Sequence, residues 1–300
     1  MDLATIREHS RKLSSRYRIT DGRKFRLSDI DPDDIAHLKK SDKQDATEAL
    51  TIGIEALTSL QDKLYAQHRW GVLIILQGID AAGKDGVIKH VMSGINPQGC
   101  NVFSFKAPST EELEHDYLWR CLRHLPRRGH IGIFNRSYYE EVVVVRVHQE
   151  LLAKQNLPPA VNGKHIWRQR FQEINNLERY LANNGFLVLK FFLHISREEQ
   201  KKRFMARLDD PNKNWKFSLS DASERQHWAD YVKAYEKMIR ATSTEYAPWH
   251  VIPADNKWFT HVTVAATIIH ALNGLDLAYP TVDEAKLTEL AKVRQTLLEE

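Results

Sequence analysis

The 300-residue sequence has little cysteine and no long hydrophobic run. Its two cysteines, Cys100 and Cys121, provide neither a disulfide framework nor metal-ligand spacing, which favours a reducing, cytoplasmic setting. No apolar stretch approaches the ~18 residues that a membrane-spanning helix needs, and the N-terminal sequence lacks the apolar core of a signal peptide. The 14 histidines show no zinc-binding pattern. We therefore expect a cytoplasmic protein without a disulfide, a zinc site or membrane contact.

The composition is that of an ordinary globular protein. Hydrophobic residues make up 42% of the chain, and its length suits one α/β domain with extensions or two small domains. The net charge of +4 is compatible with an anionic substrate. The sequence contains no aromatic–basic RNA motif and no recognition-helix signature, so we expect no nucleic-acid partner.

Five apolar runs in the sequence predict strands of the kind that lies in a parallel sheet covered on both faces. They are 72–77, 101–107, 130–135, 186–195 and 249–254. Helical periodicity predicts helices over 42–68, 110–125, with Thr110 as N-cap, and 164–185, closed by Gly185. Strands that alternate with helices predict an α/β fold with a parallel sheet flanked by helices.

We divide the chain into three parts. Residues 1–70 form an N-terminal arm, irregular over 1–40, and a long helix packed on the core. Residues 71–275 form the core, with a lid at about 197–220, and residues 276–300 contain a C-terminal surface helix. Over 142–150 strand propensity conflicts with position after a strand end, so strand and helix both remain open.

A glycine-rich stretch, GIDAAGKDG at 78–86, follows the first buried strand. Gly78, Gly83 and Lys84 match the G-x-x-x-x-G-K pattern in the strand–loop–helix setting that it requires. Loop amides, the helix N-terminus and the lysine would bind phosphate oxygens. The alternative is a plain turn between strand and helix. The candidate phosphate-binding residues are Gly78, Ala81, Ala82, Gly83, Lys84, Asp85 and Gly86.

Two aspartates distinguish this loop from the usual one. Asp85 occupies the position where a hydroxyl residue ordinarily binds Mg²⁺, and Asp80 lies inside the loop. A carboxylate beside phosphate is repelled unless metal ions lie between them or the carboxylate orients a nucleophile. This predicts a magnesium-rich site with an unusual phosphoryl donor or acceptor. Alternatively, Asp80 points outward and Asp85 only complements the helix dipole.

The third predicted strand ends in a second polar motif, FNRSYYEE at 134–141. Asn135 lies where a metal-binding Asp is usual, and Arg136 directs a cation to the crevice at the carboxyl ends of the strands. Glu140 and Glu141 bring back acidic charge. The alternative is that Asn135 caps a turn and that both glutamates are solvated.

With both motifs identified, the sequence resembles the polyphosphate kinase 2 family. The resemblance covers roughly residues 40–275 and includes RFMARLDDPNKNWKFS at 203–218 and PWHVIPADNK at 248–257. It implies a phosphate-loop kinase core similar to thymidylate kinase, and Mg²⁺-dependent phosphoryl transfer between inorganic polyphosphate and nucleotides. Many members have Asp at the position of Asn135. The N-R-S-x-Y-E form is similar to class III members, which accept both AMP and ADP.

The segment at 197–220 is rich in lysine and arginine. Arg203 and Arg207 are four residues apart and share a helix face, before DDPNKN ends the helix. In nucleotide kinases such a segment is a lid over the phosphates, and a polyphosphate chain would need a track of cations. Lys106, at a strand end, would extend this track. The alternative is an ordinary solvated charged face.

We expect reversible phosphoryl transfer from polyphosphate to ADP and AMP, with guanine nucleotides as other acceptors and Mn²⁺ as a substitute for Mg²⁺. The predicted catalytic residues are Asp80, Lys84, Arg136 and Glu140; the metal ligands Asp80, Glu140 and Glu141; and the nucleotide contacts Asn135, Tyr139, Asp255 and Lys257. An ATP-dependent nucleoside monophosphate kinase and a non-enzymatic nucleotide-binding switch remain as alternatives. The resemblance also implies a dimer or tetramer.

Overall fold

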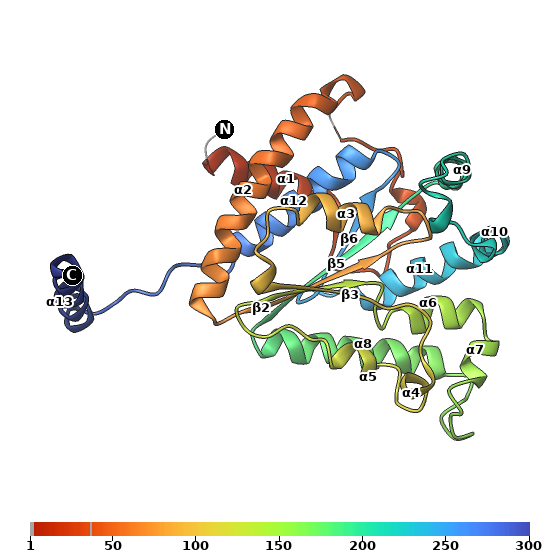
Figure 1. Ribbon diagram of the computed structural model, residues 1–300. Helices are drawn as coiled ribbons and strands as arrows, with labels where there is room; N and C mark the ends of the chain where they lie inside the picture. The colour runs from red at the N-terminus through yellow and green to blue at the C-terminus, as the bar shows by residue number, and fades with distance from the viewer. Residues whose placement is uncertain (1–2, 37) are drawn as a thin grey trace.

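A six-stranded sheet forms the centre of the molecule, in the order β1-β6-β5-β2-β4-β3 (Figure 1). The computed structural model describes residues 3–36 and 38–300, so residues 1–2 and 37 of the predicted arm lie outside the described part. Five strands run parallel, and the short edge strand β1 pairs antiparallel with β6. The strands are β1 Arg18–Ile19, β2 Gly71–Gln77, β3 Cys100–Ser104, β4 Ile131–Asn135, β5 Phe186–His194 and β6 Trp249–Pro253.

Helices cover both faces of the sheet and create two apolar cores. On one face α12 packs against α1, α2 and α3, and on the other α11 packs against α6 and α8 (Figure 1). The helices are α1 Leu3–Arg16, α2 Lys43–Gln67, α3 Lys84–Val91, α4 Thr110–Leu113, α5 Trp119–Leu122, α6 Glu140–Val147, α7 Glu150–Ala153, α8 Ile166–Asn183, α9 Arg197–Leu208, α10 Leu219–Glu224, α11 Trp228–Thr242, α12 Lys257–Asn273 and α13 Glu284–Glu299.

The predicted strands are confirmed as β2 to β6. Strands β2, β4, β5 and β6 are largely buried on both faces, which leaves continuous apolar runs in the sequence, whereas β3 is a more exposed edge strand. The long helix after the arm is also confirmed, as is the role of Gly185, which adopts φ 77° after α8. The ambiguous segment after β4 is helical, as α6.

Three local predictions are wrong. The segment 110–125 forms two short helices, because Asp116 accepts a hydrogen bond from the amide of Leu118 and turns the chain between them. Ser109, not Thr110, caps α4. The N-terminal arm is not irregular throughout, since α1 packs on α12 and β1 extends the sheet.

The C-terminal helix α13 is exposed along its whole length and lies apart from the body of the molecule (Figure 1). In the described ranges, no helix has the length and apolar character needed to cross a membrane.

Candidate active site

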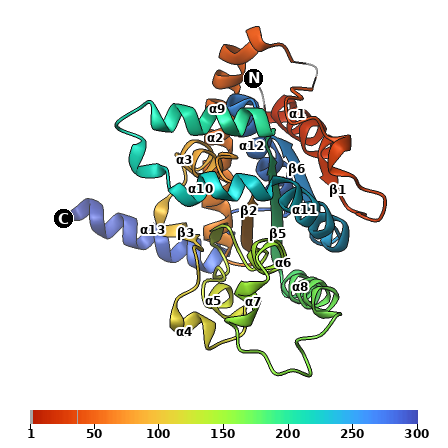
Figure 2. The same ribbon diagram turned by 90° about the vertical axis from the view of Figure 1, so that its right-hand side faces the viewer.

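A cavity of about 1300 Å³ opens at the carboxyl ends of the parallel strands. Helices α3, α9 and α10 lie on one side of it, and α4, α6 and α7 on the other (Figure 2). The loops after β2 and β4 form its floor, because the two strands are hydrogen-bonded neighbours in the centre of the sheet. Open α/β sheets bind ligands at this edge, so the fold brings both sequence motifs to one place.

The loop after β2 has the backbone of a phosphate-binding loop. Ala81 and Gly83 adopt positive φ angles of 64° and 111°, which turn the chain into α3. Lys84 is 8% exposed, and its Nζ donates to the carbonyl of Gly78 over 2.7 Å. Burial, and secondarily the charge of Arg136, lowers the pKa of Lys84 to about 8. An anionic phosphate would stabilise the charged form of this lysine.

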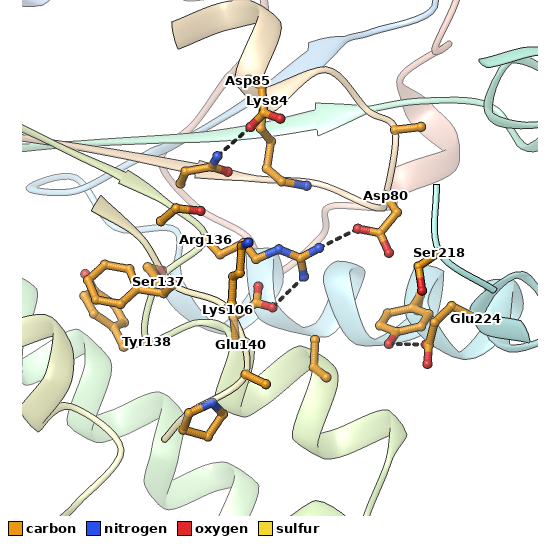
Figure 3. Close-up of a pocket in the computed structure, with 18 of the residues that line it drawn as sticks. Asp80, Lys84, Asp85, Lys106, Arg136, Ser137, Tyr138, Glu140, Ser218 and Glu224 are labelled. Atoms are coloured by element: carbon orange, nitrogen blue, oxygen red, sulfur yellow. Dashed lines mark hydrogen bonds and ion pairs between the residues drawn. The ribbon is translucent and has the colours of Figure 1, made fainter. Parts of the chain in front are cut away.

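Arg136 links the two motifs. Its Nη2 donates to Asp80 Oδ1 over 2.5 Å and its Nη1 to Glu140 Oε2 over 2.9 Å (Figure 3). The charge of Glu140 raises the pKa of Arg136 above its ordinary value, with burial opposing and Asp80 adding to the effect. The backbone of Arg136 has φ 65°, and its amide donates to the carbonyl of Leu76 on β2. An uncommon backbone conformation at this point directs the guanidinium into the cavity.

Gln77, which sequence reasoning missed, holds the Glu140 carboxylate from behind and is itself held by Ser137. Gln77 is fully buried at the end of β2; with its amide oriented to satisfy both neighbours, it donates to Glu140 Oε1 (2.9 Å) and accepts from Ser137 Oγ (3.2 Å). Glu140 therefore contacts Gln77 through one oxygen and Arg136 through the other. A polar residue closing an otherwise apolar strand is the signal that could have identified Gln77.

Asp85 and Asn135 form a second link between the motifs. Asn135 Nδ2 donates to Asp85 Oδ1 over 2.7 Å, and both residues line the cavity. Figure 3 marks this hydrogen bond by the dashed line at Asp85. Asn135 thus contacts the phosphate-binding loop itself. Neither alternative from the sequence, a turn cap for Asn135 or a dipole role alone for Asp85, includes this contact.

Glu141, a predicted metal ligand, borders the cavity but has both oxygens engaged elsewhere. Arg170 donates to Oε1 over 3.0 Å and Gln155 to Oε2 over 2.7 Å. Burial raises the pKa of Glu141, with Arg170 opposing. Asp80 belongs to the loop itself, and Glu140 is linked to Asp80 through Arg136. Across the described residues no three acidic, histidine or cysteine side chains form a ready metal cluster. The donor set fits a Mg²⁺ ion held by one or two carboxylates with phosphate oxygens and water.

Arg203 does not extend from a lid toward phosphate. Its five donor hydrogens are engaged: Nε with Glu199 (2.9 Å), Nη1 with the carbonyls of Ala81 (2.9 Å) and Ala82 (3.0 Å), and Nη2 with those of Ala254 (2.5 Å) and Asp255 (3.1 Å). The side chain is 8% exposed. Although Arg203 lines the cavity, all of its donors are engaged by the protein, so it supports the phosphate-binding loop instead of making the predicted lid contact.

Of the predicted nucleotide contacts Tyr139, Asp255 and Lys257, one lines the cavity and the other two do not. Lys257 lines the cavity, as do Lys106 and Arg207 of the cation track. Tyr139 is fully buried, and its hydroxyl donates to Glu178 (2.7 Å), so the structure corrects its predicted nucleotide contact. Asp255 accepts from the amide of Ser196 over 2.8 Å and lies outside the cavity lining.

Two lining residues, Tyr138 and Glu224, were not among the predicted site residues. Tyr138, next to the misassigned Tyr139, borders the cavity while its hydroxyl donates to Glu178. Glu224 reaches the cavity from α10 and accepts from the hydroxyl of Tyr231 over 2.7 Å (Figure 3). Their positions depend on long-range packing that no local pattern encodes.

Comparison with known proteins identifies the family and the fold. The sequence profile of a family described as polyphosphate kinase 2 matches residues 37–279. The chain is 52% identical to an ADP-polyphosphate phosphotransferase of Rhodopseudomonas palustris, covering 85% of this chain and 89% of that protein. It is 45% identical to an AMP/ADP-polyphosphate phosphotransferase of Meiothermus ruber, covering 90% and 97%. The crystal structure of polyphosphate kinase 2 from Arthrobacter aurescens superimposes with a TM-score of 0.86 at 38% identity, covering 94% and 96%.

Proposed function

This chain belongs to the polyphosphate kinase 2 family and is a polyphosphate:nucleotide phosphotransferase, and we propose that it phosphorylates both ADP and AMP with inorganic polyphosphate as donor. One relative is named for ADP and another for AMP and ADP. The observation that carries the proposal is the contact of Arg136 with both Asp80 and Glu140 above the phosphate-binding loop. These two contacts hold the guanidinium of Arg136, from the motif after β4, close to the phosphate-binding loop that contains Lys84.

The cavity wall offers both charged and apolar surface, which supports a polyanionic donor and a nucleotide acceptor. Toward α9 and α12 it contains Arg207 and Lys257, together with the aromatic Trp215. Toward α4 and α6 it contains the aromatic Tyr117, together with the cation Lys106. A polyanionic chain suits the cations, because cations along a track neutralise successive phosphates. A purine base suits the aromatic side chains, because they offer apolar contact surface.

We assign roles by where charge develops during transfer. Lys84 and the loop amides hold the phosphoryl group, and Arg136 stabilises the charge on it as it passes between oxygens. The transfer needs no general base, because the terminal phosphate of ADP or AMP is already an anionic nucleophile. Transfer is reversible, since the bond broken and the bond formed with ADP are both phosphoanhydrides. Positioning and charge neutralisation supply the rate enhancement.

A divalent metal ion, Mg²⁺ with Mn²⁺ as substitute, fits between the carboxylates and the substrate phosphates. Asp80 and Glu140 line the cavity on either side of Arg136. Both oxygens of Glu140 accept one hydrogen bond each, from Arg136 and Gln77, but a carboxylate oxygen has a second lone pair that can bind a metal ion. When bound, the metal would neutralise phosphate charge that the carboxylates otherwise repel. Without it, Arg136 is the group that neutralises both carboxylates.

The deciding experiment measures ATP formation from ADP and long-chain polyphosphate with Mg²⁺, with AMP as a parallel acceptor. We expect ATP from ADP, and ADP followed by ATP from AMP. Lys84→Ala and Asp80→Asn should abolish turnover, whereas Lys89→Ala, an exposed lysine on the same helix, should not. Turnover with ATP and a nucleoside monophosphate, but none with polyphosphate, would instead identify a nucleoside monophosphate kinase. Nucleotide binding without any turnover would identify a switch.

A further inference from the structure

Asp85 and Asn135 occupy the two positions where phosphate-loop kinases ordinarily hold their metal ion. In the ordinary arrangement the residue after the loop lysine is Ser or Thr, and an Asp comes from the neighbouring strand. In this chain the loop position carries the carboxylate and the strand position carries the neutral side chain. The pair keeps a single negative charge, but that charge has moved from the strand to the loop.

The two side chains meet although they are 50 residues apart in sequence. Asn135 Nδ2 donates to Asp85 Oδ1 over 2.7 Å (Figure 3). Asn135 is 9% exposed at the end of β4, whereas Asp85 is exposed on the first turn of α3. An amide that binds one carboxylate oxygen fixes the direction of the carboxylate, and the other oxygen can then bind a cation.

Complementing the helix dipole does not by itself account for this pair. A carboxylate on the first turn of α3 is favourable wherever its side chain points. It requires no partner from another strand, yet the polar side chain that closes β4 donates directly to it. An Asp at position 135 would place a second negative charge in hydrogen-bond contact with Asp85, which explains why an amide is suitable there.

We propose that Asp85 is a ligand of the divalent metal ion that accompanies the polyphosphate, and that Asn135 is the positioning residue that orients its carboxylate. The proposal rests on the proposed function and adds Asp85 to the metal-binding candidates Asp80 and Glu140. Because the described residues form no metal cluster of their own, the ion binds together with phosphate. The measurable consequence is a coupling between metal and phosphate affinity that depends on Asp85.

The test is a calorimetric titration of the full chain with tripolyphosphate, with and without Mg²⁺. The dissociation constant for tripolyphosphate without Mg²⁺, divided by that with Mg²⁺, measures how strongly the metal ion promotes phosphate binding, and it requires no turnover. We expect Asp85→Asn to lower this ratio about ten-fold or more, since even partners of metal ligands contribute about 10–100-fold to metal affinity. Asn135→Ala should lower it less. Asp230→Asn, which removes an exposed first-turn carboxylate from α11, is the matched control and should leave it unchanged.

An exchange of residues makes the test independent of simple damage. Asp85→Thr should lose the coupling, and adding Asn135→Asp should restore most of it by recreating the ordinary arrangement. Tripolyphosphate binding without Mg²⁺ should be retained or strengthened in Asp85→Asn, because a repelling charge is gone. A thermal melt of each variant confirms that it is folded.

Two results would overturn the proposal: an unchanged ratio in Asp85→Asn, or no recovery in the double variant. Failure of the proposed function looks different. In that case the wild-type chain makes no ATP from polyphosphate, while the calorimetric ratios still report what Asp85 does. A wild type that makes ATP while Asp85→Asn keeps its full coupling would remove Asp85 and leave the function intact.

Discussion

Two polar networks in this protein each contain a buried lysine, but they differ in how many of the lysine's hydrogen-bond donors are used. Under the sheet, Lys190 donates to Glu178 (2.6 Å), to the carbonyl of Thr242 (2.7 Å) and to the hydroxyl of Tyr139 (3.0 Å), and both charged side chains are 0% exposed. At the cavity, Lys84 donates to a single carbonyl among the described residues, that of Gly78. The first lysine has used all three of its hydrogens, whereas the second retains donors for a ligand.

The segment 136–140 takes part in both networks, so it contributes to stability and also to the active site. Tyr138 and Tyr139 both donate to Glu178, while Arg136 and Glu140, on either side of them, line the cavity. The closed network therefore anchors the segment that presents the open one. A fully satisfied network specifies structure, and one with unused donors and acceptors next to a cavity is suited to binding.

The largest effect should come from Arg136, and it should be on turnover. Arg136→Ala removes the cation between Asp80 and Glu140, and arginines of this kind contribute about 10³–10⁵-fold to phosphoryl transfer. We expect kcat to fall by about 10³-fold or more, and the melting temperature to change little because both carboxylates border the cavity. Steady-state kinetics with ADP and polyphosphate, and a thermal melt, check this.

Arg136→Lys is the control for charge alone. A single ammonium cannot reproduce the fork that contacts two carboxylates at once, so we expect only slight recovery. A kcat within ten-fold of wild type in Arg136→Ala would contradict the role of this side chain.

The matching change in the closed network should affect stability instead. Lys190→Met leaves Glu178 buried with no cation, and breaking a buried pair in this way costs about 3–5 kcal/mol of the free energy of unfolding. The double variant Lys190→Met/Glu178→Leu should recover much of the loss, because the unpaired charge is gone. Urea denaturation measures both, and equal stability of the single variant and the wild type would refute the comparison.

Arg203 tests whether a cation at the loop acts on the substrate or on the protein. Its five hydrogen bonds end on Glu199 and on backbone carbonyls, so Arg203→Lys and Arg203→Met should be similarly impaired. We expect kcat/KM to fall by about 10–100-fold, the order of effect that small misplacements of a reacting group produce. At Arg207, which lines the cavity, the lysine variant should keep more activity than the methionine variant. The reverse pattern at the two sites would reassign them.

How much of this site could be predicted depends on the range of the interactions. The phosphate-binding loop and the strands have local sequence signals. The spacing of Gly78, Gly83 and Lys84 was sufficient to place the loop, and apolar runs were sufficient to place the strands. The contact of Asn135 with Asp85 depends on the pairing of β2 with β4, which single-sequence patterns do not give. Helical spacing correctly put Arg203 and Arg207 on one helix, but it could not show that Arg203 is buried against the loop.

The direction of side chains was the hardest feature to predict from the sequence. Only four residues, 136–139, separate the end of β4 at Asn135 from the start of α6 at Glu140, so neither a two-residue nor a 3.6-residue period applies between them. Tyr139 therefore points into the core although its neighbours Tyr138 and Glu140 reach the cavity. Glu141 has both oxygens engaged by Arg170 and Gln155. A motif read from sequence identifies the segment, and packing decides which of its residues face the ligand.

The smallest expected effect is a pH dependence of Lys84. Its pKa of about 8 in the folded, ligand-free chain lies below the ordinary 10.5, because burial disfavours the charged form. Above pH 8 the free enzyme loses this charge, so kcat/KM for polyphosphate should fall by up to about ten-fold per pH unit. Lys84→Arg stays charged, so any activity it retains should not show this fall.

Stability should change in the opposite direction over the same interval. Between about pH 8 and 10.5 the unfolded chain binds more protons at position 84 than the folded chain, so this residue makes the free energy of unfolding rise with pH. Subtracting the urea denaturation profile of Lys84→Met from that of the wild type isolates the contribution. A wild-type kcat/KM that stays level to pH 9.5, or a Lys84→Arg variant with the same decline, would show that the loop lysine is not the titrating group.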